Sequence, residues 1–450
     1  MPTPPTRSHR DHRRQIWQLA WPMILANLSI PALGLADTAM LGHLSSGQFL
    51  SAAALGSSVL TFIFWSFGFL RMGTTGASAQ ADPSGSSAVL AKALMLGGIL
   101  GLLIALLHLP LTKFALALIN TPDSLRPLAE EYLSIRLLSA PAVLCSYGIS
   151  GWLIGQRNTK APLAIAVLIN SLNILLDYLF IVQWQWQSAG AAWASVCSEM
   201  AGLVIGLVIC RRALGELGRQ GWRGVLQARQ SGKQFLADNG RIFIRTAALL
   251  FGFLFFTVQG AGLGDEILAA NAILLQLVMA SAYGMDGFAH AAEALCGRAF
   301  GQRDRRAFFA MCRACAEWSL LSAALATLIL ALLKQPIIHT MTDLPALRLL
   351  AGEFYPWMLA FPLISVASYL FDGIFIGALR TQAMQWAMLL CVFGIYLPCW
   401  YLTQNWGNHG LWLSFACLNG SRSLIMLGLF LRLGRASHWQ QSENNIQTPS

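Results

Sequence analysis

Long apolar stretches alternate with short polar connections along almost the whole chain of 450 residues. Most stretches reach about 20 residues, and at about 1.5 Å per residue a helix of that length crosses the apolar part of a bilayer. The stretches lack the period-two alternation of barrel strands, and only helices or closed barrels satisfy their backbone in lipid. The pattern therefore predicts an all-helical membrane protein. It has twelve transmembrane segments, at about 16–40, 52–80, 90–111, 127–155, 161–183, 189–210, 241–262, 268–297, 310–333, 348–377, 383–404 and 408–432.

Composition and charge support this class and indicate an orientation. The chain is 56% hydrophobic and 11% charged, which excludes an ordinary soluble domain. Its net charge of +10 does not indicate nucleic-acid binding, because most of its 30 lysines and arginines flank the same ends of the segments. Arg241 and Arg245 are assigned to this side. The positive-inside rule then predicts a multi-pass protein of the bacterial cytoplasmic (inner) membrane with both termini in the cytoplasm.

The chain also carries an internal repeat. GWLIGQRNT at Gly151 resembles GIFIGALRT at Gly373, an offset of 222, and LSAAAL at Leu50 resembles LAANAI at Leu268, an offset of 218. Six segments separate the copies, so they have the same orientation, and we expect two pseudo-symmetric lobes around a central cleft. The predicted parts are an N-terminal tail 1–15, an N-lobe 16–212, a cytoplasmic linker 213–238, a C-lobe 239–432 and a C-terminal tail 433–450.

Ionisable residues lie inside the predicted segments. Placing a charge at the centre of a bilayer costs roughly 2.5–3.5 kcal/mol even on lenient insertion scales, so such residues are candidates for an ion or substrate pathway. The set comprises Asp37, Asp177, Glu199, Asp286, His290, Glu293, Glu317 and Asp372.

Asp37 lies in PALGLADTAMLGH, near the end of the first segment. Pro22 precedes it on the same segment, removes a backbone hydrogen bond and permits a helix bend. In one interpretation the Asp37 carboxylate binds and releases a proton. The alternative is an interfacial carboxylate that caps a helix or pairs with Arg71.

A second polar group lies on the fifth and sixth segments. In LINSLNILLDYLFI, Asn170, Asn173 and Asp177 follow one stripe of a helix, and Ser195 reaches a similar depth on the next segment. An amide, a carboxylate and a hydroxyl suit a proton relay or a hard cation. The alternative is hydrogen bonding that only joins neighbouring helices.

The eighth segment supplies a further polar stripe. Tyr283, Asp286, His290 and Glu293 are spaced by 3, 4 and 3 residues, on one helix face. A histidine titrates near neutrality, so proton handling is one interpretation; a metal site and a stripe paired with arginine are the others. Asp372, on the tenth segment, has no partner that the sequence identifies, and its role stays open.

The remaining charges and several glycines have structural interpretations. We expect Glu199 and Glu317 to pair with nearby cytoplasmic basic residues, and Arg71, Arg136 and Arg422 to be counter-charges inside the segments. Glycines four residues apart predict close helix packing. The pairs are Gly97 and Gly101, Gly151 and Gly155, and Gly373 and Gly377.

Other kinds of function lack their sequence signatures. The chain has no G-x-x-x-x-G-K-[ST] loop for ATP and no nucleophile–base constellation, so neither direct ATP drive nor enzymatic activity is expected. The CxxC at Cys312 and Cys315 has no second pair, and we predict no metal and no cofactor. A protein that moves a substrate along such a pathway would then take its energy from an ion gradient.

Five stretches resemble the multidrug and toxic compound extrusion (MATE) family, in its DNA-damage-inducible F branch. They read LAWPMILANLSIPALGLADTAMLGHL, FLRMGTTGASAQA, AYGMDGFAHAAEALCGRAFG, YLFDGIFIGALR and GNHGLWL. The resemblance implies a proton- or sodium-driven exporter of organic cations with two six-helix lobes. It also implies that Asp37 is the coupling carboxylate, that Asn173, Asp177 and Ser195 complete a cation-binding cluster, and that the first helix bends at Pro22.

One departure from the family bears on the coupling ion. Other branches use a glutamate of the seventh helix with an aspartate of the tenth as a sodium site, whereas the segment 242–262 contains no acid. We therefore expect a monomeric, proton-coupled antiporter that contacts membrane lipids and exports small cationic or amphiphilic molecules, with sodium coupling as the alternative. A lipid-linked substrate flippase is a further alternative, but it would favour an arginine-lined cleft, and acids outnumber arginines inside the segments.

Overall fold

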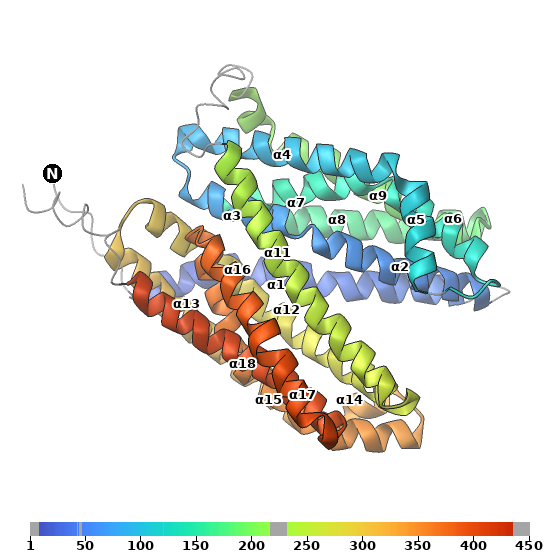
Figure 1. The fold of residues 1–450 in the computed structure, drawn as a ribbon. Helices are drawn as coiled ribbons and strands as arrows, with labels where there is room; N and C mark the ends of the chain where they lie inside the picture. Colours follow the sequence, from blue (N-terminus) through green and yellow to red (C-terminus); the bar gives the residue numbers. More distant parts are fainter. Residues whose placement is uncertain (1–8, 43, 45–46, 120, 217–231, 435–450) are drawn as a thin grey trace, which may run out of the picture. The chain divides into compact units, whose positions relative to one another are not determined.

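The structure is a computed structural model that describes residues 9–42, 44, 47–119, 121–216 and 232–434. Within these ranges the chain is almost entirely helical and contains no strand (Figure 1). The predicted all-helical class is therefore confirmed. Residues 1–8 and 435–450 of the predicted tails, and 217–231 of the predicted linker, lie outside the described ranges.

The helices match the predicted membrane segments. Ten of them are long and apolar enough to cross a bilayer, and the pair Arg126–Leu137 and Ala140–Gly155, bent by 47°, makes an eleventh span. Helix α1, His9–Gly42, has 34 residues and coincides with the first predicted segment. The described residues thus contain ten or eleven candidate spans, and α1 lies at the position of the first predicted segment.

The chain divides into two compact units, Leu25–Asn239 and Met1–Ile24 with Gly240–Ser450. Among the described residues, the first contains the second half of α1, the start of α11, the π-helix η1 and further α-helices. These are α2 Gly47–Ser66, α3 Phe69–Gln80, α4 Pro83–Leu106, α5 His108–Leu118, α6 Arg126–Leu137, α7 Ala140–Gly155, α8 Lys160–Asp177, η1 Tyr178–Gln183 and α9 Gln187–Ile209.

The other unit contains the first half of α1 and most of α11, Gly232–Gly262. Its further elements are α12 Asp265–Gly301, α13 Arg305–Leu332, α14 Lys334–Met341, α15 Pro345–Gly377, α16 Thr381–Leu389, the π-helix η2 Leu390–Tyr396, α17 Leu397–Thr403, the short 3-10 turn η3 Gln404–Trp406 and α18 Asn408–Leu433. Its core is rich in aromatic side chains, among them Phe256, Tyr355, Trp412 and Phe415.

The glycine pairs allow very close packing, as predicted. A Cβ added at Gly151 would lie 2.3 Å from the carbonyl oxygen of Arg71 on α3. A Cβ added at Gly155 would lie 2.7 Å from the carbonyl oxygen of Thr75 on the same helix. In the other unit, a Cβ at Gly373 would lie 2.3 Å from the carbonyl oxygen of Ala289 on α12, and Gly377 repeats the arrangement. The repeat seen in the sequence is thus also a repeat of helix contacts, between α3 and α7 and between α12 and α15.

Each half of α1 packs within its own unit. In the first half, the Trp17 ring stacks on Trp318 of α13, with centroids 5.3 Å apart. In the second half, Ser29 Oγ accepts a hydrogen bond from Asn170 Nδ2 of α8 at 2.9 Å. The helix continues through the buried Pro22, and a bend at this residue stays a prediction.

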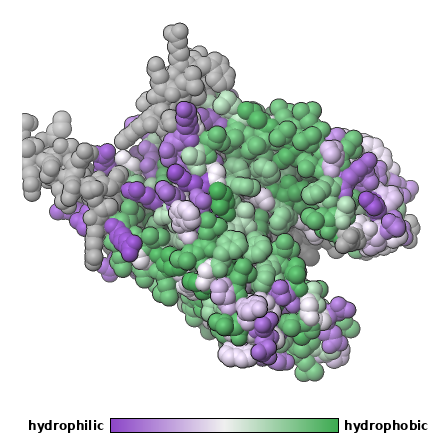
Figure 2. Space-filling view, in the orientation of Figure 1, coloured by the Kyte–Doolittle hydropathy of each residue, from purple (hydrophilic) through white to green (hydrophobic). Residues whose placement is uncertain are grey.

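Apolar side chains cover much of each unit's surface. Leu103 of α4 is 51% exposed, and Leu321 of α13 is 57% exposed. Figure 2 shows hydrophobic residues along the length of the visible helices and hydrophilic residues gathered toward helix ends. This distribution is typical of helices whose outer faces contact lipid.

Candidate functional site

The unit Leu25–Asn239 holds two carboxyl groups side by side. Asp37 of α1 and Asp177, the last residue of α8, have side chains within hydrogen-bonding reach of each other. One oxygen of each, Oδ1, is buried and has no hydrogen-bond partner in the part of the chain that the structure describes. Two ionised carboxylates at this distance repel each other, so the pair is stabilised when a proton or another cation lies between them.

Asn173 and Ser195 complete the group around Asp177. With the Asn173 amide oriented to satisfy both neighbours, its nitrogen donates to Asp177 Oδ2 at 2.8 Å, and its oxygen accepts from Ser195 Oγ at 3.1 Å. Asn173 lies one turn before Asp177 on α8, and Ser195 lies on α9. The structure therefore brings together the four residues that were predicted as a group.

The chain enters a π-helix, Tyr178–Gln183, immediately after Asp177. A π-helical turn breaks the regular i→i−4 hydrogen-bond ladder, and such turns occur frequently at functional sites. Hydropathy does not reveal this element, because its residues, YLFIVQ, have the same apolar pattern as the helix before them.

An arginine–glutamate pair adds to the electrostatics of this site. Arg136 of α6 donates to both carboxylate oxygens of Glu199 on α9, at 2.9 and 3.1 Å. Arg136 is close enough to Asp37 and Asp177 to interact electrostatically with both. Its predicted role as a counter-charge is confirmed. Glu199, however, pairs with this intramembrane arginine and not with a cytoplasmic basic residue.

Asp372, in the other unit, has two partners that the sequence did not identify. Its carboxylate accepts hydrogen bonds from Arg245 of α11 and from Arg422 of α18. The prediction that Arg422 is a counter-charge is confirmed, and Arg245, assigned to the cytoplasmic flank, is a second buried counter-charge of the same carboxylate. Arg245 is 4% exposed, because it lies one turn further into α11 than Arg241, within the apolar run RIFIRTAALL.

The predicted stripe on α12 divides into two groups. Asp286 lies within electrostatic range of Arg245, Tyr283 and Tyr369. One turn later, His290 Nδ1 and Glu293 Oε1 are 3.2 Å apart, with both side chains buried. The Asp286 group thus extends the cluster around Asp372, whereas His290 and Glu293 contact each other.

Glu317 of α13 shows the pairing that the sequence predicted. Its carboxylate accepts from Arg13 Nη2 at 2.7 Å, and Arg313 lies 3.4 Å away on the same helix. Glu317 is therefore explained by ion pairing with these two arginines.

Comparison with known proteins identifies the family. The model of the family MatE matches residues 22–179 and 242–402, which is more than two thirds of the chain. The chain belongs to the MatE family. The matched ranges include Asp37, Asp177, Asp286 and Asp372.

Individual relatives agree over nearly the full length. The chain is 37% identical to DNA damage-inducible protein F of Escherichia coli (strain K12) over 95% of this chain and 94% of that protein. Its fold superimposes with a TM-score of 0.84 on an outward-facing multidrug resistance MATE family transporter, at 19% identity, covering 96% and 99% of the two chains. A MOP superfamily transporter from Pyrococcus furiosus gives a TM-score of 0.82 at 20% identity, covering 94% and 95%.

This membership confirms the family resemblance and the expectation of a transporter rather than an enzyme. The chain is a multi-pass membrane protein of a family of multidrug efflux transporters.

Among the described residues, no group of three or more His, Cys, Asp or Glu side chains has the geometry of a metal site.

Proposed function

We propose that this protein is a proton-coupled antiporter that exports small organic cations across the bacterial cytoplasmic membrane, with Asp37 and Asp177 as the coupling site. Both termini then lie in the cytoplasm, and the transporter acts as a monomer. The observation that carries the proposal is the carboxyl pair, in which one buried oxygen on each partner lacks a protein donor among the described residues. A single shared proton supplies the hydrogen bond that this arrangement needs.

The groups around the pair favour a proton over sodium. A hard cation takes oxygen ligands, whereas the Asn173 amide presents its nitrogen to Asp177 and turns its oxygen to Ser195. A proton requires only a carboxyl oxygen and an acceptor, and the pair provides both.

The other unit gives little support for sodium coupling. Asp372 is the aspartate that the family resemblance would assign to a sodium site, but Arg245 and Arg422 both contact it. Two guanidinium groups at one carboxylate neutralise its charge and exclude a metal cation from the same oxygens. Proton coupling through Asp37 and Asp177 therefore remains our proposal.

The proposed cycle follows from charge. A proton from the outer side binds between Asp37 and Asp177, removes a negative charge and weakens the attraction of the site for a bound cation. The cation leaves to the outer side, and the proton is later released to the cytoplasm. Pro22 on α1 supplies the position at which that helix bends between the two states.

A lipid-linked flippase is the second candidate, because the structure adds Arg245 to the intramembrane arginines. Such substrates carry phosphates and would need arginines that are available for binding. Arg245 and Arg422 instead contact Asp372, with Asp286 nearby, so their charge is compensated. This compensation favours cation export.

Gradient-driven transport in proteoliposomes distinguishes the coupling ions. Vesicles containing the full chain and a fluorescent organic cation are given either a pH gradient without sodium or a sodium gradient at uniform pH. We expect the pH gradient alone to drive movement of the cation. Movement driven by sodium and not by protons would contradict the proposal.

A further inference from the structure

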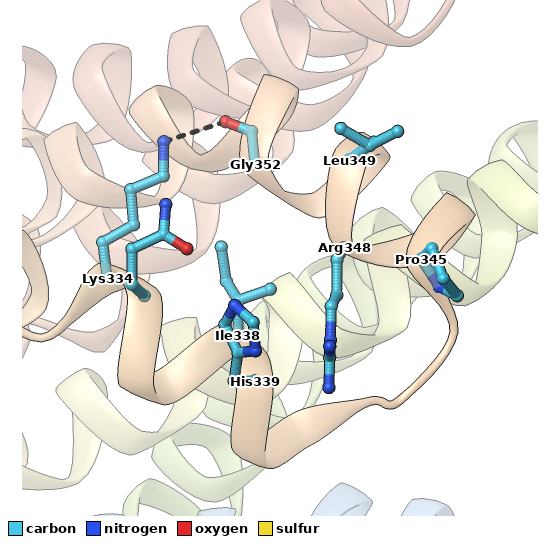
Figure 3. Close-up of a pocket in the computed structure, with 8 residues that line it drawn as sticks. Lys334, Ile338, His339, Pro345, Arg348, Leu349 and Gly352 are labelled. Atoms are coloured by element: carbon cyan, nitrogen blue, oxygen red, sulfur yellow. Dashed lines mark hydrogen bonds between the residues drawn. The ribbon is translucent and has the colours of Figure 1, made fainter.

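A basic pocket lies where two candidate spans meet the membrane boundary. The spans Arg305–Leu332 and Pro345–Gly377 are joined by the short helix α14 and a brief loop. Between α14 and the start of α15 is a cavity of about 510 Å³, and its lining includes Lys334, Ile338, His339, Arg348, Leu349 and Gly352. Figure 3 shows His339 between Lys334 and Arg348 in this pocket.

The positive charge of the pocket is only partly compensated. Lys334 Nζ donates to the Gly352 carbonyl oxygen at 3.2 Å and lies 5.4 Å from the centre of the Tyr355 ring (Figure 3). Within the described ranges it has no carboxylate partner. Arg348 Nη2 is 3.0 Å from Asp343 Oδ1, but the side chain of Asp343 is fully exposed and does not line the pocket. None of the lining residues is acidic, so the positive field that an anion meets is compensated only at Arg348, by Asp343.

Exposed leucines include Leu349, which lines the pocket, and Leu332 and Leu344, which lie within two residues of lining residues along the chain. Leu332, the last residue of α13, is 72% exposed, and Leu344 and Leu349 are 61% and 76% exposed. At the end of two membrane spans, leucines this exposed are positioned to contact acyl chains. The pocket therefore combines a cationic hollow with an apolar border, which matches a ligand with an anionic head and a hydrocarbon tail.

We propose that this pocket binds the phosphate headgroup of an anionic phospholipid. Lys334, His339 and Arg348 supply the donors for the phosphate, and the exposed leucines contact its acyl chains. Basic pockets beside membrane helices bind anionic headgroups in this way. On the predicted topology the lipid belongs to the outer leaflet. This site is separate from the proposed coupling site, so either proposal can fail without the other.

Native mass spectrometry of the purified full chain tests the proposal. The protein in detergent is titrated with phosphatidylglycerol, with zwitterionic phosphatidylcholine and with inorganic phosphate, for the wild type and for Lys334→Gln and His339→Gln. We expect phosphatidylglycerol to bind in preference to phosphatidylcholine, and its affinity to fall about fivefold in Lys334→Gln, which removes a full charge. His339→Gln should weaken it further when combined with Lys334→Gln.

Two matched variants control for folding and for general surface charge. Lys334→Arg keeps the charge and should bind like the wild type, which separates loss of charge from local disruption. Lys113→Gln removes an exposed lysine from α5, a short helix of the other unit, and should also leave binding unchanged. Wild-type affinity in the Lys334→Gln/His339→Gln double variant would overturn the proposal. Displacement of the lipid by an equal concentration of inorganic phosphate would overturn the assignment to a lipid and identify a free-anion site.

Discussion

At the scale of single residues, each charge buried in this protein lies among neighbours that decide what it can do. Asp177 receives a hydrogen bond from Asn173 and lies next to Asp37, which is an arrangement suited to exchanging a proton. Asp372 is contacted by two arginines, Arg245 and Arg422, which compensate the charge of its carboxylate. Two aspartates in similar apolar sequence therefore have different predicted roles.

The hydrogen bond from Asn173 should be important for transport. Asn173→Ala leaves a buried oxygen of Asp177 without its donor, and a lost hydrogen bond to a charged group costs about 1.5–3 kcal/mol. We expect pH-driven cation transport to slow at least about tenfold in proteoliposomes. Asn405→Ala, which removes an exposed amide, should transport at the wild-type rate. Equal rates for the two variants would remove Asn173 from the site.

Asp372 should matter for stability. Asp372→Ala leaves the buried charges of Arg245 and Arg422 without this acid. Removing one partner of a buried ion pair lowers the free energy of unfolding by about 3–5 kcal/mol. Thermal unfolding in detergent should show a clear loss of stability. Asp343→Ala removes an exposed partner of Arg348 and should change stability by less than about 1 kcal/mol. A stable Asp372→Ala protein would mean that the arginines have other partners.

The residue scale also shows where sequence reasoning reaches its limit. The α8 stripe could be predicted because helix periodicity alone places Asn173 and Asp177 on one face. The partners of Asp372 could not, since they come from α11 and α18, 127 and 50 residues away along the chain. The buried role of Arg245 was missed because a basic residue at the start of a span resembles an exposed flanking charge until its burial is known.

At the scale of helices, backbone contact at glycine sets how closely neighbours approach. Gly151 of α7 and Gly373 of α15 occupy equivalent positions of the repeat, and each lies against a carbonyl oxygen of the adjacent helix. The spacing of these glycines predicted this packing correctly. By contrast, the π-helices Tyr178–Gln183 and Leu390–Tyr396 could not be predicted, because hydropathy does not distinguish a π-turn from an α-turn.

Adding one methyl group at these contacts should force the helices apart. Gly373→Ala would place a Cβ 2.3 Å from the Ala289 carbonyl oxygen, and overpacking of this kind costs about 1–3 kcal/mol. Gly428→Ala on α18 meets no atom within 4 Å and is the matched control. We expect a lower melting temperature for Gly373→Ala and an unchanged or raised one for Gly428→Ala. The same melting temperature for both would contradict close packing of α12 and α15.

At the scale of the whole molecule, the sequence predicted the class, the twelve segments and the repeat, because hydropathy and periodicity are local properties. The compact units depend on contacts between distant segments. Trp17 and Arg13 join the first half of α1 to α13, so residues up to Ile24 group with the second half of the chain. A boundary placed by loop length alone would not find this division.

The central claim, proton coupling at Asp37, is tested most directly by proton movement. Proteoliposomes containing the full chain and an internal pH indicator, in sodium-free buffer, receive an organic cation from outside. For the wild type we predict an internal pH change that depends on the added cation. For Asp37→Asn we predict a pH change no larger than that of protein-free vesicles. Glu131→Gln, which removes an exposed carboxylate in the same unit, should behave like the wild type. A cation-dependent pH change of wild-type size in folded Asp37→Asn protein would contradict the account.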